Sequence, residues 1–106
     1  MIRAMLAIAI LTLTTTVAWS AGFLKGSDLH ALCQSASTLD KQSCMAYILG
    51  ALDTMGNTGT APCNVSDVSG TEFIDVVKAY LQNNPASLVY EAPMSIHLAY
   101  DNQFCP

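Results

Sequence analysis

The stretch that decides the fold is Cys44-Met45-Ala46-Tyr47-Ile48-Leu49-Gly50-Ala51-Leu52-Asp53-Thr54-Met55. Its apolar residues recur three and four positions apart, which is the spacing of one face of an α-helix. The side chains on this face are Cys44, Tyr47, Ile48, Ala51, Leu52 and Met55. Met45, Ala46 and Leu49 extend the apolar surface further around. We therefore expect a helix over residues 41–56 that is buried centrally or covered by a partner chain.

Glycine inside this predicted helix needs a physical reason. Gly50 lies near its middle, where glycine costs roughly 1 kcal/mol relative to alanine. Such a cost is usually compensated by the close approach of a second helix, which we expect here. Residues 56–60 are polar and contain two glycines, so they predict a flexible loop after the helix.

The residues before this helix predict a shorter one. Ser27 is suited to cap a helix over residues 28–36, and Asp28 would lie favourably at the positive end of its dipole. Residues 37–40 predict a turn, with Asp40 as the N-cap of the following helix. The two helices would form an antiparallel hairpin.

Helices are also predicted after the central one. Ser69 and Glu72 match a capping box, which predicts a helix over residues 70–82. Pro85 is placed as the first residue of a short helix over 86–90. Pro93 either breaks that helix or opens another one that reaches residue 102. The fold class we predict is an all-α, disulfide-stapled bundle of four to five helices.

The N-terminus predicts an export signal. Arg3 precedes an apolar run over residues 4–11, and Ala18-Trp19-Ser20 places small residues where a signal peptidase reads. We expect cleavage after Ser20, which leaves residues 21–106 as a single domain in the periplasm. The alternative is an uncleaved membrane anchor, but the apolar run is short against the ~20 residues that a spanning helix needs.

Four cysteines follow the predicted signal: Cys33, Cys44, Cys63 and Cys105. An even number in a short exported chain is typical of disulfides, although the sequence alone allows three pairings. The hairpin brings the last turn of its first helix next to the first turn of its second. We therefore expect Cys33–Cys44 and, by elimination, Cys63–Cys105. Zinc is the alternative, but no Cys-x-x-Cys spacing is present.

Charge and chemistry indicate a binding protein. Residues 21–106 contain three lysines, no arginine and eight carboxylates, which disfavours nucleic acid and anionic membranes. His30 and His97 are expected on helix surfaces, and neither Asp53 nor Asp101 has an obvious carboxylate partner. We predict no enzymatic activity, no cofactor and no metal. Asn64-Val65-Ser66 matches a glycosylation acceptor, which matters only in a eukaryotic secretory pathway.

A family resemblance follows from the spacing of cysteines, aromatic residues and glycine. The elements are Leu29-x-x-x-Cys33, Cys44-x-x-Tyr47-x-x-Gly50-x-x-Asp53, Cys63, Tyr80-Leu81-x-x-x-Pro85 and Phe104-Cys105. This arrangement resembles the Rap/Tai family of periplasmic immunity proteins. The resemblance implies a small helical protein, often dimeric, that neutralises a peptidoglycan amidase toxin of type VI secretion. Tyr47 and Gly50 would belong to the scaffold.

Three functions remain open at this point. The first is an amidase inhibitor, for which we expect Asp53, Asn57, Thr58, Gly59 and Thr60 to contact the toxin. The second is a general periplasmic stress or chaperone-like protein, and the third is a module of an envelope assembly. A homodimer through the helix over residues 41–56 would hide apolar surface that one chain leaves uncovered. The alternative is burial among the other helices.

Overall fold

The structure, a computed structural model, describes residues 24–63 and 68–106 and is all-helical there. The elements are α1 (Gly26–Gln34), α2 (Thr38–Thr58), α3 (Gly70–Asn83), the 3-10 helix η1 (Pro85–Val89) and α4 (Ala92–Phe104). The predicted all-α class is confirmed. The predicted signal sequence and its cleavage after Ser20 lie outside the described residues, as does the Asn64-Val65-Ser66 motif.

The first two helices begin earlier than their sequence suggests. Ser27 is the second residue of α1, and Lys25 takes the cap position, where its N–H donates to the Asp28 carboxylate at 3.0 Å. Ser37, and not Asp40, caps α2 by accepting a hydrogen bond from the Asp40 N–H. Asp40 instead accepts from the Ser35 hydroxyl at 2.7 Å. Several capping residues stand close together in each case, so the polar pattern alone does not select one.

Gly26 is required where α1 meets the start of α4. The Gly26 N–H donates to the Tyr90 carbonyl at 2.7 Å, and the Ala92 N–H donates to the Leu24 carbonyl at 2.6 Å. A Cβ on Gly26 would lie 2.6 Å from the Ser87 carbonyl oxygen. Glycine therefore allows the chain before α1 to pair with the chain before α4.

The later helices follow their predicted signals closely. Ser69 caps α3 by accepting from the Glu72 N–H at 3.1 Å. Pro85 begins η1, which is a 3-10 helix. Pro93 lies in the first turn of α4 and therefore opens this helix, which ends at Phe104 and not at residue 102.

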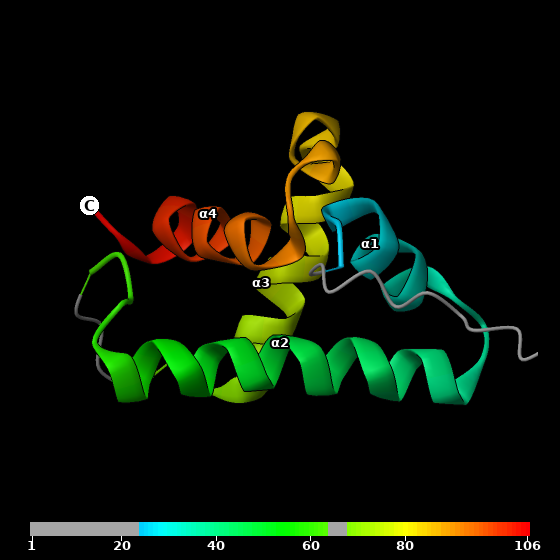
Figure 1. Cartoon of the computed structure of the whole chain (residues 1–106), viewed down its shortest axis with the longest axis horizontal. Helices are drawn as coiled ribbons and strands as arrows, with labels where there is room; N and C mark the ends of the chain where they lie inside the picture. The colour runs from blue at the N-terminus through cyan, green and yellow to red at the C-terminus, as the bar shows by residue number, and fades with distance from the viewer. Residues whose placement is uncertain (1–23, 64–67) are drawn as a thin grey trace, which may run out of the picture.

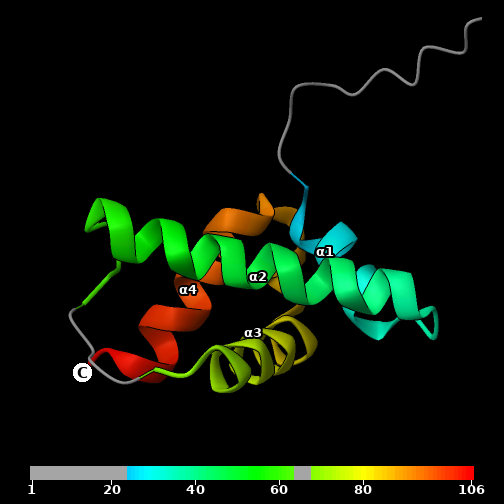
Figure 2. The same ribbon diagram turned by 90° about the horizontal axis from the view of Figure 1, so that it is seen from below.

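The helices surround a core that α3 crosses. In Figure 1, α2 runs along one edge of the molecule, α4 and α1 lie on the same side of it, and α3 crosses behind. Figure 2, turned by 90°, shows α4 crossing behind α2, so that its C-terminal part lies on the same side of α2 as α3. The largest fully buried side chains come from α1, α2, α3 and α4: Leu29, Ile48, Phe73, Val77, Leu81 and Ile96. Each helix thus contributes one apolar face to a shared core.

The disulfide Cys33–Cys44 closes the α1–α2 hairpin, as predicted. Its Cα atoms are 5.0 Å apart, and both residues lie in the core, with exposed fractions of 7% and 2%. The second predicted pair, Cys63–Cys105, is also present. The first disulfide thus joins two packed helices, whereas the second joins the chain after α2 to the residue that follows α4.

The outer side of α2 is uncovered in the single chain. Met45 is 41% exposed and Leu49 is 36% exposed, while Leu39 at the start of the helix is 71% exposed. Gly50 has open space around it, because a Cβ there would meet no atom within 4 Å. The expected close approach of a helix to Gly50 is wrong within one chain. α2 is thus not a centrally buried helix.

Candidate partner-binding surface

The residues predicted to contact a partner lie at the C-terminal end of α2. Asp53, Asn57 and Thr58 belong to the helix itself, whereas Gly59 and Thr60 follow it. All five are exposed. The prediction of a loop from residue 56 is therefore wrong, since α2 continues to Thr58.

The last turns of α2 carry two threonine hydroxyls that bond to the helix backbone, and a glycine ends the helix. The Thr58 hydroxyl donates to the Thr54 carbonyl at 2.6 Å, and Thr54 donates to the Gly50 carbonyl at 2.8 Å. Gly59 then ends the helix with φ of 66°, in the left-handed region that glycine tolerates best. The Thr60 N–H donates a hydrogen bond to the Met55 carbonyl at 3.1 Å, as in a Schellman motif.

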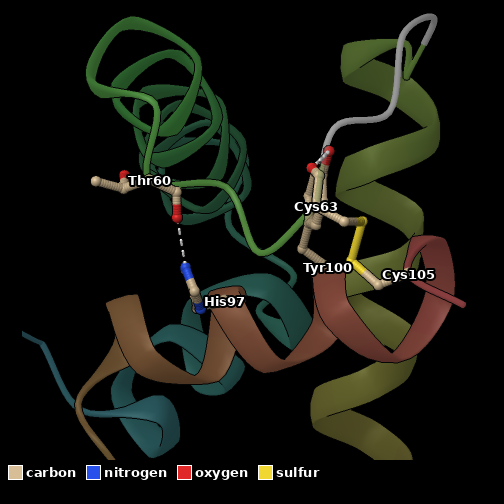
Figure 3. Close-up of a disulfide and its surroundings, with 5 residues drawn as sticks. All are labelled: Thr60, Cys63, His97, Tyr100 and Cys105. Atoms are coloured by element: carbon tan, nitrogen blue, oxygen red, sulfur yellow. Dashed lines mark hydrogen bonds between the residues drawn. A yellow bond between two sulfur atoms is a disulfide. The ribbon is translucent and has the colours of Figure 1, made fainter.

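The segment after α2, residues 59–63, is attached to α4 at three points. The Thr60 carbonyl lies 2.8 Å from His97 Nε2, and the Tyr100 hydroxyl donates to the Cys63 carbonyl at 3.2 Å. The disulfide Cys63–Cys105 adds a covalent link to the residue that follows α4, over a Cα separation of 5.7 Å. Figure 3 shows these groups along one side of α4, facing the segment. We call residues 59–63 the tethered segment.

His97 must donate in its hydrogen bond, because a carbonyl oxygen only accepts. The neutral Nε2–H tautomer and the imidazolium ion both carry this proton. The expectation that His97 is a plain surface residue is incomplete, since its ring is half-buried and bonded to the tethered segment. His30 is half-buried on α1.

An aromatic cluster fixes the position of Tyr100. Its ring centroid lies 5.8 Å from that of Phe73 and 5.3 Å from that of Phe104. The Tyr100 residue is only 3% exposed. A buried tyrosine usually finds a partner for its hydroxyl, which here is the Cys63 carbonyl. Tyr100 thus links the buried core to the tethered segment by a hydrogen bond.

A largely apolar groove of about 600 Å³ runs between α2 and α4 and ends at the tethered segment. Tyr47, Gly50 and Met55 line it from α2, Pro93, Ile96 and His97 from α4, and Thr60 from the segment. Burial and the nearby Glu91 carboxylate raise the pKa of the Tyr47 phenol above its ordinary value of 10.0. Tyr47 is therefore a neutral hydroxyl on the groove wall at any physiological pH. A half-buried tyrosine on the groove wall is compatible with the scaffold role predicted for Tyr47.

The described residues show neither a metal site nor a membrane-spanning helix. Within residues 24–63 and 68–106, no three His, Cys, Asp or Glu side chains gather in a way that could hold a metal ion. Across the same residues, no helix combines the length and apolar character needed to cross a membrane. The paired arrangement of all four cysteines leaves no thiol for zinc.

The sequence could not single out His97 and Tyr100. They are three positions apart and so share a face of α4, but the same spacing occurs at many helix surfaces. Their partners are backbone carbonyls 37 positions earlier in the chain. A backbone acceptor has no sequence signature, so only the folded arrangement reveals these contacts.

Comparison with known families identifies the chain. Its sequence matches the Rap1a immunity proteins over residues 25–105, a range that includes α1 to α4 and both disulfides. No curated protein and no solved structure gives a significant match. Immunity proteins act by binding a toxin and not by catalysis, so the match favours the inhibitor hypothesis over a stress protein or an assembly module. The chain therefore belongs to the family of Rap1a immunity proteins.

Proposed function

We propose that this immunity protein acts in the periplasm, where it binds and inhibits a peptidoglycan amidase toxin delivered by type VI secretion. The observation that carries the proposal is the family match over residues 25–105. The toxin class follows from the resemblance of the cysteine, tyrosine and glycine spacing to the Rap/Tai proteins. An inhibitor of a cell-wall enzyme must reach the compartment that contains the wall.

Two features support export to that compartment. Residues 1–20 have the charge, apolar run and small-residue pattern of a cleavable secretory signal. Cys33–Cys44 and Cys63–Cys105 are disulfides, which form and persist in oxidising compartments such as the bacterial periplasm. We expect the mature protein to begin at Ala21.

The proposed toxin-binding surface is the C-terminal end of α2 with the tethered segment. Asp53 and Asn57 are four positions apart and share one exposed face of the helix. Thr58, Gly59 and Thr60 form the adjoining end of the molecule. The exposed carboxylate and amide supply groups that can hydrogen-bond a catalytic groove, and Gly59 lets backbone approach closely.

The test is inhibition of wall hydrolysis by an amidase. The probe is a purified peptidoglycan amidase toxin of type VI secretion, chosen first from any amidase-like reading frame found beside the gene of this chain. We expect the mature protein to abolish hydrolysis of purified peptidoglycan at about one chain per toxin. The double variant Asn57→Arg/Thr58→Arg should lose inhibition, because it places two long cations in the proposed contact.

The matched control is Gln42→Arg/Ser43→Arg near the start of α2. Gln42 is an exposed amide like Asn57, and Ser43 donates to the Leu39 carbonyl at 3.0 Å as Thr58 donates to Thr54. This control should inhibit like the wild type. Equal inhibition by both double variants would show that the end of α2 does not contact the toxin. No inhibition by the wild type would exclude this amidase as the target.

We also propose a homodimer through the outer side of α2. Met45 and Leu49 expose apolar area on this side of the helix. A two-fold contact would place the same patch of both chains together. Sedimentation equilibrium should give the mass of two chains for the wild type and of one for Met45→Glu/Leu49→Glu. A monomeric wild type at micromolar concentration would contradict the proposal.

A further inference from the structure

We propose that His97 and Tyr100 of α4 are positioning residues, which hold the tethered segment in the conformation that the toxin binds. This inference rests on the proposed function for its consequence in binding. Its structural basis is the pair of hydrogen bonds to the Thr60 and Cys63 carbonyls, with the disulfide Cys63–Cys105 beside them.

The tethered segment has little apolar burial of its own. Gly59 and Thr60 are exposed, and residues 61–63 are only half-buried. A segment of this kind is held by individual contacts, because burial of its side chains contributes little to its order. The Gly59 and Thr60 amides bond to the Met55 carbonyl at the end of α2. The other contacts come from positions 97 and 100 of α4 and from Cys105, which follows it.

The donors on α4 are themselves well fixed. Tyr100 is nearly fully buried against Phe73 and Phe104, so its hydroxyl has a defined position. His97 follows Ile96, which is 1% exposed, on a helix whose far end is fixed by the Cys105 disulfide. α4 thus acts as a rigid support, and the segment takes its conformation from that support.

The two hydrogen bonds are expected to have a measurable effect. A single intramolecular hydrogen bond changes the balance between an ordered and an open state by roughly threefold to tenfold. If only the ordered state binds, the apparent affinity falls in proportion to the fraction of chains that are ordered. Loss of either bond should therefore weaken toxin binding by up to roughly tenfold, with the full factor reached where the open state predominates, and without unfolding the helices.

The experiment compares His97→Leu and Tyr100→Phe with controls of the same chemistry elsewhere. His30→Leu, on α1, matches the first change, and Tyr90→Phe, at the exposed end of η1, matches the second. His97→Gln is the rescue variant, because its amide can donate near the position of Nε2. Far-UV circular dichroism in urea measures the global stability of each protein.

The first measurement is hydrogen exchange at the Gly59 and Thr60 amides of the free protein. Both amides bond to the Met55 carbonyl, so they report whether the segment stays against the end of α2. We expect exchange to be at least about threefold faster in His97→Leu and near wild type in His97→Gln and His30→Leu. Unchanged exchange in both His97→Leu and Tyr100→Phe would overturn the inference.

The second measurement is calorimetric affinity for the amidase probe. We expect a loss of up to roughly tenfold in His97→Leu and Tyr100→Phe, with recovery in His97→Gln and no loss in the controls. Faster exchange with unchanged affinity would show that order in the segment does not matter for binding. If the wild type does not bind the amidase, the proposed function is wrong, and the exchange rates alone decide whether α4 holds the segment.

Discussion

Cys33–Cys44 and Cys63–Cys105 join parts of the molecule that the rest of the fold supports in different ways. The first lies in the core, where α1 and α2 already pack over apolar faces. The second joins the half-buried tethered segment to the end of α4, beside two hydrogen bonds to backbone carbonyls. One end of the molecule is thus held by burial, and the other by a few specific tethers. The end held by tethers is the one proposed to meet the toxin.

The largest effect is expected from removal of the buried disulfide. In the chain-entropy model a disulfide stabilises more when it closes a longer loop. Cys63–Cys105 spans 42 residues and Cys33–Cys44 spans 11, so the model gives Cys63–Cys105 about 1 kcal/mol more stabilisation. Loss of two buried sulfur groups at Cys33 and Cys44 costs about 2 kcal/mol. Burial therefore outweighs loop length, and Cys33→Ala/Cys44→Ala should lower the free energy of unfolding by about 4 to 5 kcal/mol.

The matched variant, Cys63→Ala/Cys105→Ala, should cost about 3 to 4 kcal/mol. Urea titration followed by circular dichroism measures both values under the same conditions. A greater loss in Cys63→Ala/Cys105→Ala would mean that loop length dominates over burial. Burial of Cys33–Cys44 would then not make it the more stabilising of the two disulfides.

The next largest effect is expected at two glycines, whose replacement by alanine should change stability in opposite directions. Gly59 has φ of 66°, so Gly59→Ala should lower the free energy of unfolding by about 1 to 2 kcal/mol. Gly50 lies inside α2 with open space around it, so Gly50→Ala should raise the stability of a single chain by up to about 1 kcal/mol.

Thermal unfolding of both variants at several protein concentrations is the measurement. Destabilisation by Gly50→Ala in dilute monomer would contradict the open space beside α2. A neutral Gly59→Ala would show that the end of α2 adopts another conformation.

The fold was largely predictable because its signals are local. Apolar spacing in α2, the Ser69 cap of α3 and Pro93 in α4 each act within one or two turns, and the structure confirms them. The disulfide pairs followed once the hairpin was assumed. The cap of α2 was misplaced because Ser37 and Asp40 compete for the same role, and that of α1 because Lys25 is not a typical capping residue.

The candidate site was only partly predictable. Its exposed residues at the end of α2 could be named from polarity and glycine content, although Asn57 and Thr58 proved to be helical. The support from α4 could not be foreseen, since His97 and Tyr100 bond to carbonyls that any residue would provide. The groove between α2 and α4 likewise depends on the packing of helices far apart in sequence.

The smallest effect is expected for the titration of Tyr47. Burial, followed by the Glu91 carboxylate, raises the pKa of this phenol above 10.0 in the folded chain. A folded pKa above the unfolded one contributes stability below about pH 10 that is lost as the pH rises further. Phenolate absorbance of the wild type minus that of Tyr47→Phe should show a midpoint above 10, which moves down in Glu91→Gln. A midpoint at or below 10 would place Tyr47 in open solvent and away from the groove wall.

The most direct test of the central claim compares the two disulfide variants as inhibitors. Calorimetry with the amidase probe is carried out at a temperature where circular dichroism shows both variants to be folded. We predict at least about a tenfold loss of affinity in Cys63→Ala/Cys105→Ala and less than about threefold in Cys33→Ala/Cys44→Ala, because only the first frees the tethered segment. Equal affinities in the two folded variants would contradict the claim that α4 holds the toxin-binding end of the molecule.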